Sequence, residues 1–198
     1  MMADPFDAIP AGDAEALAER LARRAVDAGL VDVRVRTIDT RLGTLLLAAT
    51  PRGLVTVAFH GDEPDATLER LADRLGTRVL RDERGLDGVA REVEALADGR
   101  ARTFDGALDL TLATGFRGAV VRALRDIPYG ETRSYGDVAR AIGSPGAVRA
   151  VGTACRLNPL PIVIPCHRVV RSDGSLGQYA GGVEAKRMLL GAEGALAG

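Results

Sequence analysis

Three short apolar runs follow one another in the first third of the chain, and turn-forming residues separate them. They are "VDVRVRTI" (31–38), "GTLLLAAT" (43–50) and "GLVTVAF" (53–59), with the turn residues "PRG" at 51–53 before the last strand-like stretch. Runs of this length that are rich in valine, leucine and threonine and end at such turns are typical of strands. Because the connections between them are short, the pattern predicts a small antiparallel sheet of three consecutive strands.

Apolar residues recur at helical spacing in three other segments of this half. These are "AEALAERLARRAVDAG" (14–29), which ends in glycine, "DATLERLADRL" (65–75) and "GLDGVAREVEALADG" (85–99). The spacing predicts amphipathic helices. A short extended piece, "TRVL" (77–80), lies between the last two, and "FDGALDL" (104–110) predicts one further strand.

From Phe116 onward the pattern changes to short helices and glycine-rich turns, so we expect two domains, residues 1–112 and 113–198. The apolar-striped helix "GFRGAVVRALRDI" is stopped by Pro128. The segment "SYGDVARAIG" follows with Ser134 as its N-cap, and the turn "GSPG" leads into "AVRAVGTACRL". Two short helices joined by such a turn are typical of a helix-turn-helix, although any helical hairpin gives the same pattern.

The second helix of this pair has the composition of a nucleic-acid-binding element. Small residues such as Ala150 and Gly152 would let it lie close to a groove. The surrounding segment, residues 117–171, carries nine arginines against three acidic residues, a net charge of +6 in a chain whose total is −1. Such a segment suits an anionic partner, and solvated surface arginines are the alternative. The side chains expected along the binding side are Arg149, Gly152, Thr153 and Arg156.

Composition sets the remaining bounds. The chain has 198 residues, of which 46 % are hydrophobic and 27 % charged, the balance of an ordinary globular protein. We expect no membrane span, since no apolar run approaches roughly 18 residues, and a cytoplasmic location, since the acidic N-terminus lacks the order of a secretory signal. Cys155 and Cys166 are too few for a disulfide scaffold. Together with His60 and His167 they lack the spacing of a zinc site, so we expect no metal and no cofactor.

Cys166 stands between a proline and a histidine in "IVIPCHRVV" (162–170). We interpret the apolar residues before it as a buried strand that Pro165 brings to an end. A buried, inert cysteine is the usual reading of a thiol in such a run. His167 and Arg168 favour a reactive one, because neighbouring cations lower the pKa of a thiol.

His167 would need help to act on this thiol. Adjacent side chains of an extended segment point to opposite faces, so the imidazole would reach the sulfur only through a turn or a bridging water. An acidic residue would also be needed to orient the ring. Glu184 and Glu193 are the downstream candidates.

The segment "SDGSLGQYAGG" (172–182) is a glycine-rich loop with one aromatic residue. It lacks the glycine spacing of a phosphate-binding loop. It is either a flexible surface loop or a pocket wall in which Tyr179 stacks on a planar ligand. Gly177, Gly181 and Gly182 would then allow the backbone to approach that ligand closely.

Together these segments resemble the O6-alkylguanine-DNA alkyltransferase family, whose members are also called methylated-DNA–protein-cysteine methyltransferases. The motif "IPCHRVV" is preceded by "RAVGTACRLNP" and followed by "GSLGQYAGGVEAKRMLLGAEG", and a looser similarity extends through "TRLGTLLLAATPRGLVTVAF". The resemblance implies an α+β fold. It has a small N-terminal antiparallel sheet with helices, RNase H-like, and a mostly helical C-terminal domain in which a winged helix-turn-helix carries the active-site cysteine.

The resemblance also implies a role for each matching residue. Cys166 is the alkyl acceptor, and His167, oriented by Glu193, draws off the thiol proton through a water. Asn158 braces the turn at the active site, and Tyr135 helps to protonate the leaving base. The DNA-contacting residues would be Tyr135, Ala150, Gly152, Thr153, Arg156 and Arg149, the last of which enters the base stack. The pocket for the base would be formed by Pro161, Val169, Tyr179, Ala180, Gly181 and Lys186.

The function implied is direct repair of double-stranded DNA that contains O6-alkylguanine. After base flipping the alkyl group passes to Cys166, and the stable thioether consumes the protein, which we expect to be a monomer. A protein that recognises alkylated DNA without repairing it is one alternative, although such proteins replace the acceptor cysteine. A cysteine hydrolase, which would turn over repeatedly, is another. Cys155 stands where the family often has a larger apolar residue, and we interpret it as a small core residue.

Overall fold

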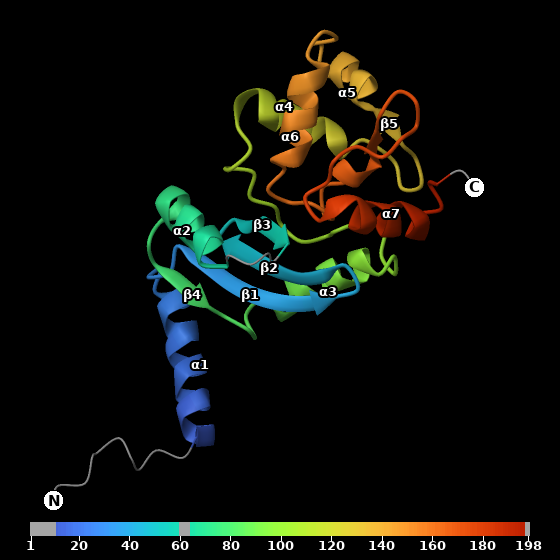
Figure 1. Ribbon diagram of the computed structural model, residues 1–198. Coiled ribbons are helices and arrows are strands. Elements are labelled where there is room, and N and C mark those ends of the chain that lie inside the picture. The colour runs from blue at the N-terminus through green and yellow to red at the C-terminus, as the bar shows by residue number, and fades with distance from the viewer. Residues whose placement is uncertain (1–10, 60–63, 197–198) are drawn as a thin grey trace, which may run out of the picture.

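The computed structural model describes residues 11–59 and 64–196, which form a sheet-containing half and a helical half above it in Figure 1. The sheet has the strand order β3-β2-β1-β4. Its first three strands, β1 (Val33–Thr40), β2 (Gly43–Thr50) and β3 (Gly53–Phe59), pair antiparallel. The short edge strand β4 (Val79–Arg81) pairs with β1 in parallel. The predicted three-stranded sheet and the extended piece after it are therefore confirmed.

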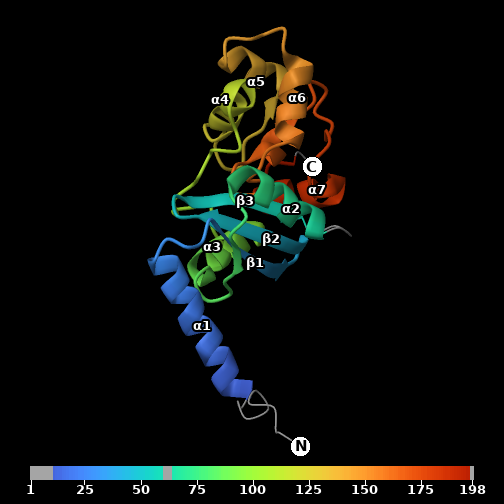
Figure 2. The same cartoon turned by 90° about the vertical axis from the view of Figure 1, so that its left-hand side faces the viewer.

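Three helices accompany the sheet, and all three match the predicted segments. They are α1 (Ala11–Asp27), α2 (Pro64–Leu75) and α3 (Asp87–Ala97). In both views α1 extends away from the sheet (Figures 1 and 2). An ion pair between Glu19 and Arg84 links it to the turn after β4.

Both faces of the sheet are buried, which explains the unbroken apolar run in β2. Neighbouring side chains of a strand point to opposite faces. Leu46 and Ala48 therefore pack with Leu71 of α2, whereas Leu45 and Leu47 pack on the opposite face with α3. The buried cluster on this second face continues into the core of the helical half, so a single apolar cluster supports both halves.

The prediction of a strand at residues 104–110 is wrong. This segment makes a single isolated bridge, between Leu108 and Leu54 at the start of β3. The side chain of Asp109 accepts a hydrogen bond from the Thr50 hydroxyl at 2.6 Å and another from the backbone N–H of Thr111 at 3.0 Å. These bonds turn the chain away from β3 before a longer ladder can form.

The helical half contains the predicted helix pair. Ser134 caps α5 as expected: its hydroxyl accepts from the Asp137 N–H, and the Asp137 carboxylate accepts from the Ser134 N–H, a capping box. Among the described residues, none of the helices has the length and apolar character needed to cross a bilayer. The elements of this half are α4 (Gly115–Leu124), α5 (Tyr135–Ala141), α6 (Val148–Arg156), α7 (Gly182–Ala192), the 3₁₀ helix η1 (Cys166–Arg168) and two short parallel strands, β5 (Arg133–Ser134) and β6 (Val169–Val170).

Candidate active site

The apolar residues before Cys166 do not form the buried strand that was predicted. Residues 159–165 make a series of turns, in which Ile162 has a left-handed backbone conformation with φ of 74°. Prolines at three of these seven positions remove the N–H donors that a strand ladder needs. The run is apolar because the turn itself is buried between the two halves, where the backbone N–H of Val57 in β3 donates to the Pro159 carbonyl at 2.9 Å.

Asn158 holds this turn and the thiol together. Its side-chain oxygen accepts from the Leu160 N–H at 3.1 Å, while its amide nitrogen donates to the Ile164 carbonyl at 2.9 Å. The same nitrogen lies 3.2 Å from Sγ of Cys166, within range of an N–H···S hydrogen bond. The side chain is itself buried, so one amide fixes both the backbone of the turn and the position of the sulfur.

Burial makes the thiol of Cys166 a neutral group. Cys166 is only 3 % exposed, and this burial raises the pKa of its thiol to about 11. The hydrogen bond from Asn158 and the charge of Lys186 lower the pKa again, but by less. The expectation that His167 and Arg168 would lower the pKa of this thiol is therefore wrong: desolvation of a thiolate outweighs the cations nearby.

The 3₁₀ helix η1 turns His167 away from the extended geometry expected for it and places it against Glu193. The Nε2 atom of His167 lies 2.9 Å from Oε1 of Glu193, which is the C-cap residue of α7. Burial lowers the pKa of His167 below its ordinary value, and the hydrogen bond with Glu193 offsets part of that effect. A neutral imidazole that donates from Nε2 to this carboxylate keeps Nδ1 as an acceptor. Nδ1 is buried and has no partner among the described residues.

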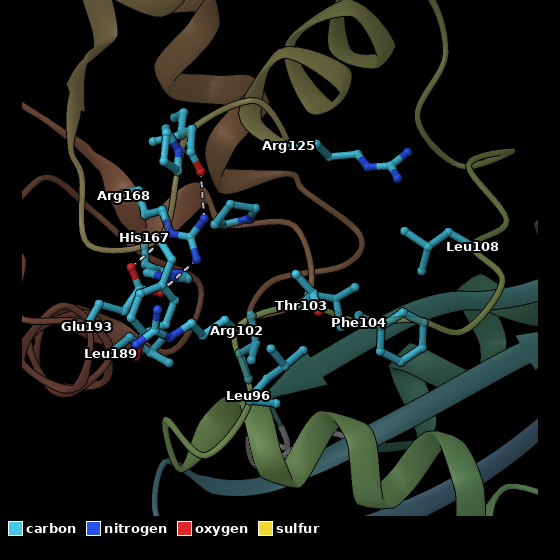
Figure 3. Close-up of a pocket in the computed structure, with 17 residues that line it drawn as sticks. Leu96, Arg102, Thr103, Phe104, Leu108, Arg125, His167, Arg168, Leu189 and Glu193 are labelled. Carbon is cyan, nitrogen blue, oxygen red and sulfur yellow. Dashed lines mark hydrogen bonds and ion pairs between the residues drawn. The ribbon is translucent and has the colours of Figure 1, made fainter.

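Arg168 completes this charged group, a role that the sequence did not reveal. Its Nε and Nη2 atoms each lie 2.9 Å from a carboxylate oxygen of Glu193, and its Nη1 donates to the Ile127 carbonyl at 2.6 Å. Together with the bond from His167, these contacts hold the pKa of Glu193 at about 2 even though burial alone would raise it. Figure 3 shows the three side chains on one wall of a cavity of about 310 Å³ between the halves.

A second buried cation acts on the thiol of Cys166. Lys186 of α7 is fully buried, and its Nζ donates to the backbone carbonyl of Val169. Burial lowers the pKa of Lys186, and its positive charge favours ionisation of Cys166. The sequence-predicted pocket residues Val169 and Lys186 therefore contact each other directly.

Two tyrosines lie near the thiol of Cys166. Tyr135, the first residue of α5, is half-buried, and burial raises the pKa of its hydroxyl. A Cβ atom added at Gly177 would lie 2.2 Å from the Tyr135 hydroxyl oxygen, so the glycine lets the loop lie directly over this ring. Tyr179 is buried and meets the His167 ring edge-on, with ring centroids 6.2 Å apart.

The N-terminal half contributes one residue to this site that the sequence did not indicate, Phe59. Phe59, at the end of β3, meets Tyr179 edge-on with ring centroids 5.7 Å apart. It also lies so close to Gly181 that an added Cβ atom would be 2.4 Å from its ring. Phe59 is an ordinary strand residue in the sequence, and only the contact between the halves gives it this place.

The helix α6 exposes the residues predicted to contact DNA and buries the opposite side. Val151, Ala154 and Cys155 pack inward, and burial raises the pKa of the Cys155 thiol to about 12, as befits the small core residue expected there. Within the described residues, no cluster of three or more His, Cys, Asp or Glu side chains could hold a metal ion. The predicted DNA contacts on α6 are exposed at Arg149, Ala150, Thr153 and Arg156 and partly exposed at Gly152.

Comparison with known proteins identifies relatives over most of the chain. The family model "6-O-methylguanine DNA methyltransferase, DNA binding domain" matches residues 115–195. A methylated-DNA–protein-cysteine methyltransferase of Mycobacterium tuberculosis (strain H37Rv) is 40 % identical over 158 residues, which cover 80 % of this chain and 90 % of the relative. One of Methanosarcina barkeri is 41 % identical over 156 residues, covering 77 % and 92 %.

Solved structures agree with these relatives. A crystal structure of the Mycobacterium tuberculosis O6-methylguanine methyltransferase has a TM-score of 0.71 at 40 % identity and covers 84 % of this chain and 95 % of its own. A crystal structure of Mycobacterium tuberculosis OGT in complex with DNA has a TM-score of 0.69 at 39 % identity, covering 81 % and 92 %. These similarities include both halves of the fold described above.

Proposed function

Because the chain belongs to the methylated-DNA–protein-cysteine methyltransferase family, we propose that Cys166 accepts the alkyl group of O6-alkylguanine in double-stranded DNA. The observation that carries this assignment is the placement of one buried thiol, held by Asn158, next to a neutral His167 that is bonded to Glu193. A nucleophile, a base and an orienting acid are the parts that such a transfer needs. The protein acts by direct reversal of damage and is consumed by it.

The pKa of the thiol explains why a base is required. With a pKa of about 11, ionising Cys166 in place at pH 7 costs about 5 kcal/mol. His167 offsets that cost by taking the proton as the reaction proceeds, through a water between the sulfur and the free Nδ1 atom. Glu193, whose own pKa is far below 7, stabilises the imidazolium that results.

The transfer itself is a displacement at the alkyl carbon. The Sγ–C bond forms while the bond from that carbon to guanine O6 breaks. The thiol proton goes to His167, and Tyr135 supplies a proton to the leaving guanine and is reprotonated from solvent. Water does not readily reverse the thioether, so each molecule repairs one lesion.

DNA binding is assigned to the helical half, residues 113–198, as a domain distinct from residues 1–112. In this assignment α5 and α6 form a helix-turn-helix, β5 and β6 contribute its wing, and the N-terminal sheet is RNase H-like. Contacts to phosphates make binding independent of sequence. Small residues at Ala150 and Gly152 let α6 approach a groove, while Arg149 fills the place of the flipped base.

The flipped guanine is placed between the turn before Cys166 and the loop after β6. The glycines of that loop permit close contact with a planar base, and Tyr179 of the same loop packs against His167 and Phe59. We further propose that the protein acts as a monomer in the cytoplasm. The residues assigned to the pocket are Pro161, Val169, Tyr179, Ala180, Gly181 and Lys186.

A comparison of wild type with Cys166→Ala tests this proposal. The variant should bind a duplex that contains one O6-methylguanine with the affinity of the wild type and leave the lesion intact. The wild type should repair one lesion per molecule and then stop. Continued turnover would indicate a cysteine hydrolase, and repair by the variant would remove Cys166 from the mechanism.

A further inference from the structure

A cavity of about 440 Å³ lies between α2 of the N-terminal half and the helical half. In Figures 1 and 2, α2 lies on the side of the sheet next to the C-terminal end of α6. We call this space the arginine cavity, because four arginines line it. They are Arg70 and Arg74 of α2, Arg117 of α4 and Arg156 at the end of α6.

Among the described residues, nothing balances the charge of this cavity. None of the residues that line it there carries a carboxylate. Within the described residues, none of the four guanidinium groups forms an ion pair, whereas other surface arginines such as Arg52, Arg78 and Arg84 do. Cations that converge on one space repel each other, and an anion bound between them relieves that repulsion.

Arg117 is held in position by a hydrogen bond. Its Nη2 atom donates to the Leu112 carbonyl, which fixes the guanidinium at the wall of the cavity. A guanidinium already held in place loses less side-chain freedom when it binds an anion, so Arg117 presents a preorganised positive charge there.

The cavity adjoins the candidate active site. Asn158, whose amide donates to Sγ of Cys166, is one of its lining residues, as are the predicted pocket residues Pro161 and Ala180. Arg156 connects it to the exposed side of α6. An anion in the arginine cavity would therefore lie at the rim of the pocket, where the backbone of a flipped nucleotide must pass.

We propose that the arginine cavity binds one phosphate of the DNA strand that carries the alkylated guanine, in a neighbouring nucleotide. Guanidinium groups match the geometry of a phosphate and bind it through paired hydrogen bonds. The N-terminal half thereby takes part in DNA binding through α2. This inference rests on the proposed function, because it needs the strand to enter at Cys166.

The first test compares two double variants that each remove two positive charges. Arg70→Ala/Arg74→Ala changes the cavity, and Arg20→Ala/Arg91→Ala changes exposed arginines of α1 and α3 that do not line it. Alanine is a good helix former, so both should fold, which their melting temperatures will check. Binding to an unmodified labelled duplex is then measured at several salt concentrations.

The cavity variant should bind roughly tenfold more weakly at 50 mM salt, and the slope of log K against log salt should fall by about 0.9, the value for one lost phosphate contact. The control variant should retain the slope of the wild type. Equal losses in the two variants would overturn the proposal, since they would reflect net charge alone. Retained wild-type affinity in the cavity variant would overturn it as well.

The second test locates the phosphate. Duplexes with one O6-methylguanine carry a single neutral methylphosphonate at successive positions, and they are bound to Cys166→Ala with or without Arg70→Ala/Arg74→Ala. One position next to the lesion should weaken binding of Cys166→Ala about tenfold but not weaken the combined variant further. If every position costs the two proteins the same, the cavity does not hold a DNA phosphate.

Competition by inorganic phosphate at constant ionic strength separates DNA from a free anion as the ligand. Free phosphate should weaken DNA binding of the wild type but not of the cavity variant. Phosphate that binds the cavity without affecting DNA affinity would overturn the proposal. All three measurements record DNA binding and none records alkyl transfer. Failure of the proposed function would therefore be seen in a different experiment, in which the wild-type protein gains no alkyl group.

Discussion

Replacement of Glu193 by glutamine should destabilise the protein because this carboxylate is the only described counter-charge of the buried Arg168 and also accepts a hydrogen bond from His167. It is 7 % exposed, and it accepts hydrogen bonds from Nε2 of His167 and from two guanidinium nitrogens of Arg168. Arg168 is itself only 10 % exposed. In Glu193→Gln the guanidinium would keep the Ile127 carbonyl as a partner but would lose its counter-ion.

The pKa of Glu193 gives the size of the effect. It falls from 4.5 to about 2 in the folded protein, and at 1.36 kcal/mol per unit this shift corresponds to about 3 kcal/mol. Because the carboxyl pKa is lowered by folding, this contribution is fully present above pH 4.5 and is lost as the pH falls towards 2. Breaking one partner of a buried ion pair costs a similar amount, roughly 3–5 kcal/mol.

Urea unfolding of the wild type, Glu193→Gln and Glu184→Gln at pH 7 measures this cost. Glu184 is on the same helix with a side chain 77 % exposed, so its replacement should leave the free energy of unfolding unchanged. Glu193→Gln should lower it by about 3 kcal/mol and the melting temperature by roughly 6–12 °C. A Glu193→Gln protein within about 0.5 kcal/mol of the wild type would refute the assignment of Glu193 as a buried counter-ion.

Three further outcomes follow from the site. Gly177→Ala should slow single-turnover alkyl transfer at least tenfold, because its Cβ would displace the Tyr135 hydroxyl by about 1 Å. The control Gly88→Ala, which has open space around its Cβ, should keep the wild-type rate, and equal rates in the two variants would contradict the contact between Gly177 and Tyr135. The transfer rate should be level from about pH 7 to 9 and should fall only below pH 6.5, since the pKa of His167 is lowered. A tenfold rise per pH unit between pH 7 and 9 would indicate instead that the thiol loses its proton to solvent before the transfer, without His167 as the base. Asn158→Ala should lower the free energy of unfolding by roughly 2–4 kcal/mol in urea titrations, because it leaves two buried backbone groups without their partner, and a loss below 1 kcal/mol would contradict that role.

The sequence predicted the elements whose signals are local. Alternation, turn residues and helical spacing placed the three antiparallel strands and the helices, and the N-cap at Ser134 was visible as a hydroxyl before a helix. Residues 104–110 had strand composition but did not form a strand, because the outcome depended on Asp109 bonding to the distant Thr50. The strand predicted before Cys166 was wrong for a related reason. Complete burial removes the periodicity that separates a strand from a buried turn.

The candidate site was predictable where the residues are adjacent in the chain or match the family motif. Cys166 and His167 are neighbours, and the resemblance selected Glu193 over Glu184 as the acid. The pairing of Arg168 with Glu193 and the contact of Phe59 with Tyr179 each join segments far apart in sequence. The thiol pKa was misjudged because adjacent cations can be read from sequence, whereas desolvation depends on the packing of both halves.

The central claim is that Cys166 takes up the alkyl group, and mass spectrometry after mixing with a duplex containing one O6-methylguanine tests it most directly. The intact protein should gain one CH2 unit, saturating at one equivalent of DNA, and peptide mapping should place it on the peptide that carries Cys166. An unmodified protein that still binds the duplex would contradict the account and leave a protein that recognises the lesion without repairing it.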